Sequence, residues 1–66
     1  MDAAQMIVVC IDQTAIAMKQ EGARDPVLME RLKGEDQAYR HSLMILVGEK
    51  AAVRMIEDFY GREVTA

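Results

Sequence analysis

The chain has 66 residues, of which 52% are hydrophobic and 29% are charged, and its formal net charge at pH 7 is -3. This composition is typical of a folded globular chain, and the acidic excess disfavours nucleic acid as a partner because it repels the phosphate backbone. The single cysteine, Cys10, excludes an internal disulfide, and the sequence has no Cys/His cluster with the spacing of a structural zinc site.

The short length limits how much stability the chain can generate alone. A small domain buries a smaller fraction of its surface than a large one, and ordering each residue costs about 1.5 kcal/mol. We therefore expect association to supply part of the stability. The first residues lack the positive region of a signal peptide, and the apolar run 6–11 is far shorter than the about 20 residues of a membrane-spanning helix. These features predict a cytoplasmic protein.

The first predicted helix covers about residues 2–21. Asp2 and Gln5 have the spacing of a capping box, in which each side chain satisfies a backbone N–H at the start of a helix. The helix is expected to stop at Gly22, because glycine tolerates the left-handed conformation that ends many helices. Its apolar face consists of Ile7, Ile11, Ala15 and Met18, and further apolar surface comes from Met6, Val8, Val9 and Cys10.

The second predicted helix covers about residues 26–60, after a short turn at 22–25. Asp25 before Pro26 is typical of an N-cap followed by proline at the first helical position. One apolar position recurs every seven residues, at Leu32, Tyr39, Leu46, Val53 and Tyr60. Because this spacing continues unchanged through Gly48, it favours one long helix.

The second predicted helix contains glycine residues that could interrupt it. Gly34 precedes two acidic residues, which favour the first turn of a helix, so a break or kink at Gly34 is the alternative to a continuous helix. After Gly61, residues 61–66 are expected to fray.

Both predicted helices are apolar on nearly all sides over part of their length, at 6–11 and at 43–47. Such a helix is normally buried on several sides, which one hairpin partner cannot achieve. We therefore expect an all-α fold in which a single helical domain, a hairpin, pairs into a homodimeric four-helix bundle. The predicted self-association residues are Ile7, Ile11, Met18, Leu43, Leu46 and Val53. The alternative is a compact three-helix monomer with a break at Gly34 or Gly48.

No residue pattern predicts catalysis, a cofactor or a metal. His41 is the only histidine, and Ser42 beside it would point about 100° away on a helix, so the two do not form a nucleophile–base pair. Ala38 stands three residues before His41, where a carboxylate-bridged metal site would need glutamate. Cys10 lies among aliphatic residues, which make a thiol inert. We expect a protein that is not an enzyme.

The leading functional hypothesis is binding to another protein, as an adaptor, an inhibitor or a regulatory subunit. Ile56, Phe59 and Tyr60 are the candidate partner-binding residues, because aromatic side chains on an apolar helix face are enriched in interface hot spots. Core packing is the commoner use of such residues.

A second hypothesis, of a different class, is sequestration of a small anionic ligand such as a nucleotide. Lys33, Arg40 and Arg54 are separated by multiples of seven residues and would form a basic stripe on a continuous helix. The competing interpretation is a solvated face with the ion pairs Glu30–Lys33, Asp36–Arg40 and Arg54–Asp58. A DNA-binding regulator is disfavoured, because the first helix is too apolar to cross a phosphate backbone.

Overall fold

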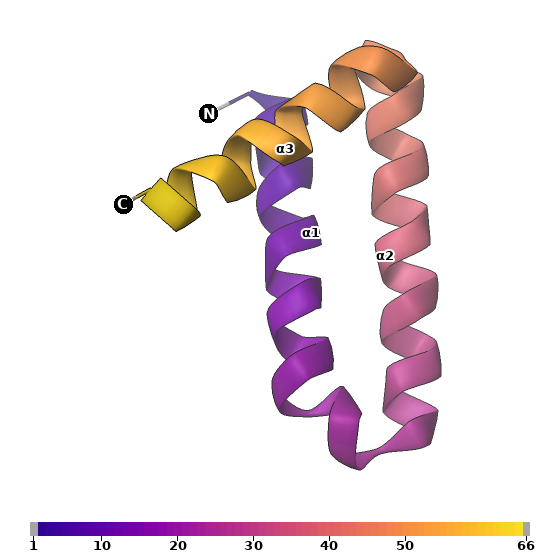
Figure 1. Cartoon of the computed structure of the whole chain (residues 1–66). Coiled ribbons are helices and arrows are strands. Elements are labelled where there is room, and N and C mark those ends of the chain that lie inside the picture. The colour runs from indigo at the N-terminus through magenta and orange to yellow at the C-terminus, as the bar shows by residue number, and fades with distance from the viewer. Residues whose placement is uncertain (1, 66) are drawn as a thin grey trace.

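The computed structural model describes the backbone of residues 2–65 and the side chains of residues 2–61. This part of the chain is all-helical, as predicted, with three α-helices and a short 3-10 helix: α1 (Ala3–Gln20), η1 (Gly22–Arg24), α2 (Pro26–Val47) and α3 (Glu49–Thr65). The α1 and α2 helices lie side by side and run in opposite directions, whereas α3 turns back at the end of α2 and passes the N-terminal part of α1 (Figure 1).

The start of α1 is the predicted capping box. The Asp2 carboxylate accepts a hydrogen bond from the Gln5 backbone N–H at 2.8 Å, and the Gln5 side-chain oxygen accepts one from the Asp2 N–H at 3.2 Å. Each bond satisfies a backbone donor that the helix itself leaves unpaired.

The end of α1 differs from the prediction. Glu21 caps the helix in a right-handed conformation, and Gly22 does not have a positive φ. Gly22 is instead buried in the turn, where an added Cβ would lie 3.3 Å from both Sδ and Cε of Met29. The turn at Gly22 therefore packs closely against the Met29 side chain of α2, and its glycine is not explained by a left-handed backbone.

The start of α2 follows the prediction. The Asp25 carboxylate accepts hydrogen bonds from the backbone N–H groups of Val27 and Leu28, at 3.1 and 3.2 Å, and Pro26 occupies the first helical turn. Proline suits this position because its missing N–H would have had no partner inside the helix.

The prediction of one helix over 26–60 is wrong, because the chain breaks at Gly48, with φ +90° and ψ 158°. Gly34 lies inside α2, so the alternative break at Gly34 is wrong as well. Among residues with side chains, the Gly48 conformation is strongly disfavoured, whereas glycine adopts it readily and is also a poor helix former. The seven-residue spacing depends only on which positions are apolar, so it gives no indication that the helix breaks at Gly48.

The helix end predicted at Gly61 is also wrong. The α3 helix continues through Gly61 to Thr65, so the expected frayed tail is helical over most of its length. A glycine in a helix costs only about 1 kcal/mol relative to alanine, which neighbouring residues can offset.

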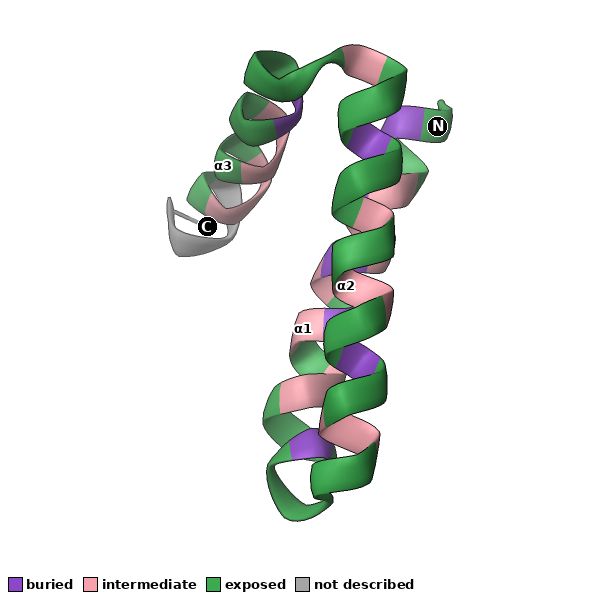
Figure 2. Ribbon diagram, turned by 90° about the vertical axis from the view of Figure 1, so that its right-hand side faces the viewer, coloured by how far each residue is buried: buried purple, intermediate pink, exposed green. Residues whose placement is uncertain are grey.

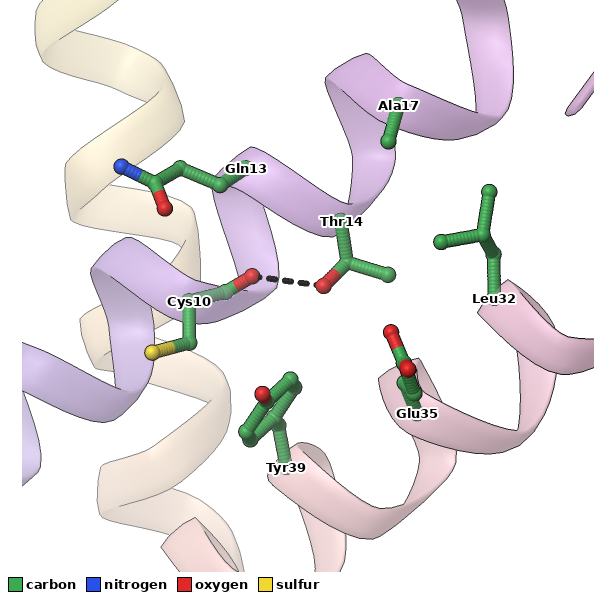
Figure 3. A pocket seen from close by; sticks show the side chains of 7 residues that line it. All are labelled: Cys10, Gln13, Thr14, Ala17, Leu32, Glu35 and Tyr39. Atoms are coloured by element: carbon green, nitrogen blue, oxygen red, sulfur yellow. Dashed lines mark hydrogen bonds between the residues drawn. The ribbon is translucent and has the colours of Figure 1, made fainter. Parts of the chain in front are cut away.

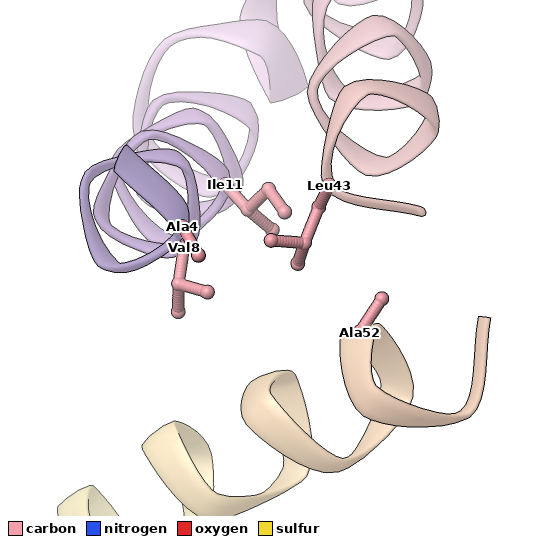
Figure 4. Packing of buried hydrophobic residues seen from close by; sticks show 5 residues of the cluster. All are labelled: Ala4, Val8, Ile11, Leu43 and Ala52. Atoms are coloured by element: carbon pink, nitrogen blue, oxygen red, sulfur yellow. The ribbon is translucent and has the colours of Figure 1, made fainter. Parts of the chain in front are cut away.

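The core lies where the three helices meet (Figure 4). Ile11 of α1 and Leu43 of α2 are the largest fully buried side chains, with 1% and 0% of their surface exposed, and Ala52 of α3 is 2% exposed. The remaining members of this cluster are Ala4 and Val8, and the half-buried residues packed around it are Ile7, Tyr39, Val47, Met55, Ile56 and Phe59. Buried residues follow the seam between α1 and α2, while the outer face of α2 is exposed (Figure 2).

Removal of the α2 cap tests its contribution. We expect Asp25→Ala to lower the free energy of unfolding by about 1 kcal/mol, because the two N–H groups lose their acceptor. Asp25→Asn keeps a side-chain oxygen at the same place and should stay close to the wild type. Urea denaturation followed by circular dichroism measures both variants, and an equal loss in both would contradict the capping role.

Truncation of Leu43 tests whether the core depends on this side chain. Leu43→Ala should destabilise the chain by about 2–5 kcal/mol, which is enough to remove most of the folded population in a small domain. Val27→Ala is the control, because Val27 is on the same helix but 81% exposed. Thermal denaturation followed by circular dichroism should show a large loss for the first variant and less than about 0.5 kcal/mol for the second.

Candidate functional site

The most distinctive surface lies at the corner where α2 gives way to α3. Three consecutive residues of the last α2 turn are exposed, with Met44 at 40%, Ile45 at 73% and Leu46 at 53% of their surface, and Val53 of α3 is 49% exposed. We call these four residues the corner patch. Single exposed aliphatic residues are ordinary, and Met6, Ile16 and Val27 are further examples, but only beside Gly48 do four such residues of the described chain lie within five positions of one helix break.

The corner patch contains two of the predicted self-association residues, Leu46 and Val53. Sequence analysis noted the apolar run 43–47 but did not assign Met44 or Ile45 to an interface. The signal for them was the length of that run, because five consecutive apolar residues cannot all face one neighbouring helix.

The other predicted self-association residues lie within the chain. Ile11 and Leu43 are buried in the core, and Ile7 and Met18 are half-buried on α1. The reason is the break at Gly48, which brings α3 onto the face that a continuous second helix would have left uncovered. In this arrangement Ile11 and Leu43 present no surface to a second copy.

The α3 residues expected to bind a partner are also used inside the chain. Ile56 and Phe59 pack around the core, and Tyr60 is half-buried. The Phe59 and Tyr60 rings meet edge to face, with 5.9 Å between their centroids and an interplanar angle of 88°. This face of α3 therefore serves mainly to hold the helix against α1 and α2.

A groove of about 220 Å³ runs between α1 and α2 (Figure 3). Its lining residues are Cys10, Gln13, Thr14 and Ala17 from α1, and Leu32, Glu35 and Tyr39 from α2. The Thr14 hydroxyl is occupied, because it donates a 2.8 Å hydrogen bond to the Cys10 carbonyl oxygen. Glu35 forms an ion pair with Arg31 of its own helix at 3.7 Å. The lining contains no basic side chain that would activate the Cys10 thiol.

The residues of the predicted basic stripe do not form one site. Arg40 pairs with Asp36 at 2.9 Å and Lys33 pairs with Glu30 at 3.6 Å, as predicted for a solvated face. Arg54 belongs to α3, on the other side of the break, and does not form the expected ion pair with Asp58. Two of the three cations thus have an acidic neighbour on their own helix, which weakens the case for an anion site.

Two further features bear on function. Within residues 2–65, no helix combines the length and the apolar character needed to cross a membrane. Among residues 2–61, whose side chains the structure describes, no group of three histidine, cysteine, aspartate or glutamate residues is placed to hold a metal ion.

The chain was compared with known proteins at three levels. No protein-family model, curated protein or solved structure matches it. The corner patch holds four of the seven exposed large hydrophobic residues of the described chain, and we take it as the candidate functional site.

Proposed function

We propose that this protein acts by binding, as a small helical module that pairs with a second copy of itself and engages another protein as an adaptor, inhibitor or regulatory subunit. The observation that carries the proposal is the corner patch, whose four aliphatic side chains expose between 40% and 73% of their surface. Apolar surface of this kind is stabilised when a partner removes it from water.

A second copy suits the patch because the core of one copy is small. Among the described residues, Ile11 and Leu43 are the largest side chains with less than 2% of their surface exposed. In a two-fold dimer the same patch is buried twice, once on each copy. Each half-exposed aliphatic side chain then contributes about 1 kcal/mol, or at most about 8 kcal/mol for the pair of patches if every side chain is covered.

This contribution sets the expected strength of pairing. Association costs about 4–15 kcal/mol in lost rigid-body freedom, which leaves at most about 4 kcal/mol, so contact between two corner patches alone gives a dissociation constant of about 1 mM or weaker. Pairing at this strength is reversible and leaves the module able to exchange its own copy for another protein.

The surroundings of the patch also fit a protein partner. Glu49 and Lys50 are exposed directly beside it, and an apolar centre with a charged rim is the usual composition of a protein–protein interface. We place this binding in the cytoplasm, since the one cysteine, Cys10, is free and the stability of the chain does not depend on a disulfide.

A charge in the corner patch tests the pairing. We expect Ile45→Glu to weaken self-association at least about 10-fold, because it puts a carboxylate into an apolar contact. Val27→Glu is the matched control, since Val27 is 81% exposed at the opposite end of the same helix and should leave association unchanged. Sedimentation equilibrium over a concentration series measures both. A wild-type chain that stays monomeric at concentrations well above about 1 mM would contradict the proposal.

The same two variants test the binding of a second protein. Affinity capture from the native cell should recover a partner with the wild type and with Val27→Glu, and recovery should fall with Ile45→Glu. A partner captured equally by all three forms would contradict a role for the corner patch in that contact.

A further inference from the structure

We infer that two copies of this chain pair by exchanging α3, with Gly48 as the hinge. In the exchanged pair, α2 and α3 of each copy form one continuous helix, and α3 packs on α1 and α2 of the other copy. The inference rests on the self-association in the proposed function and specifies its geometry.

The conformation of Gly48 is the first support. Its φ of +90° and ψ of 158° lie in a region that is essentially restricted to glycine. An added Cβ at this position would meet no atom within 4 Å, so the restriction comes from the backbone alone. One residue therefore makes the whole connection between α2 and α3, and short connections of this kind favour exchange of the element that follows them.

The hydrogen bonds around Gly48 show how small the change to a continuous helix is. The Gly48 N–H already donates to the Met44 carbonyl at 2.8 Å, and the Gly48 carbonyl accepts from the Ala52 N–H at 3.0 Å. Both are bonds of a regular helix. Rotation of Gly48 into the helical conformation would pair the carbonyl groups of residues 45–47 with the N–H groups of residues 49–51.

The heptad spacing gives the second support. Leu46 and Val53 are about half exposed in the bent chain, at 53% and 49%. Leu46 already belongs to the same helix as Leu32 and Tyr39, which are buried and half-buried in α2, and in a continuous helix Val53 would follow at the same heptad position. Straightening at Gly48 would thus extend the apolar spacing of α2 beyond its present end, where a second copy would cover Leu46 and Val53 together.

The contacts of α3 give the third support. Ala52 is 2% exposed, and Ile56 and Phe59 pack against the same core as Ile11 and Leu43. A second copy presents an identical surface, so an exchanged α3 makes the same contacts that it makes in its own chain. The corner patches of the two copies then lie at the middle of the pair, where the two straight helices pass each other.

The test uses two substitutions with opposite expected effects. Gly48→Ala disfavours the bent conformation and favours the continuous helix, so it should tighten dimerisation at least about 100-fold. Glu49→Pro should do the reverse and weaken dimerisation, because proline suits the first turn of a separate α3 but interrupts a continuous helix. Sedimentation equilibrium measures both, and circular dichroism shows that each variant is folded.

A distance measurement identifies the straight helix directly. Spin labels at Gln37→Cys and Asp58→Cys, in a Cys10→Ser background, occupy exposed positions of α2 and α3. Labelled protein diluted with unlabelled protein reports the separation within one chain. The two labels are 21 positions apart, so a continuous helix in the dimer predicts a separation of about 32 Å between them. The bent monomer predicts a clearly shorter separation.

The outcomes separate this inference from the proposed function. Tighter pairing of Gly48→Ala together with the long distance supports the exchange of α3. A dimer that Ile45→Glu dissociates but that keeps the short distance overturns the exchange and leaves the proposed self-association in place. If the wild type and Gly48→Ala are both monomeric at every concentration, the exchange and the proposed self-association fail together.

Discussion

The burial of Leu43 between α1 and α3 is the interaction on which the rest of this structure depends. Leu43 is fully buried, and Ile11 and Ala52 reach it from the two other helices. Within one chain this contact requires α3 to fold back, and α3 can do so only if the helix breaks at Gly48. The loss of helical hydrogen bonds at the break is offset by the removal of apolar surface from water on three helices at once.

The packing around Leu43 also determines which apolar residues remain exposed on the surface. Folding back covers Ile11 and Leu43, but it leaves the outer side of the last α2 turn without a neighbour, so Ile45 remains 73% exposed. A chain of this size cannot cover every apolar residue with the helices it has. The corner patch is what remains uncovered, and its position beside the break links the internal packing to the proposed pairing.

The sequence predicted those parts of the fold that depend on a few neighbouring residues. Asp2 with Gln5, and Asp25 with Pro26, define helix starts through local hydrogen bonds, and both are present. The break at Gly48 was not predicted as the leading fold, because it depends on contacts between residues far apart in the chain. For Gly22 the expected left-handed conformation was wrong, because Gly22 has no positive φ and packs instead against Met29 of the next helix.

The candidate site could also be predicted only in part, because it depends on contacts between residues far apart in the chain. Helix periodicity placed Leu46 and Val53 in an apolar stripe, and both are exposed in the structure. It could not distinguish Leu46 from Leu43, which has the same residue type and lies in the same apolar run. Which of these residues is buried is decided by the direction of α3, and that direction follows from one pair of backbone angles.

The buried glycine in the turn also bears on how α1 and α2 are aligned along their length. Met29 fills the space that Gly22 leaves, with its sulfur 3.3 Å from the position of an added Cβ. A slide of one helical turn, about 5.4 Å, would move Met29 away and open a void at this end of the pair. Packing at the turn thus favours the alignment in which Ile11 of α1 and Leu43 of α2 meet in the core.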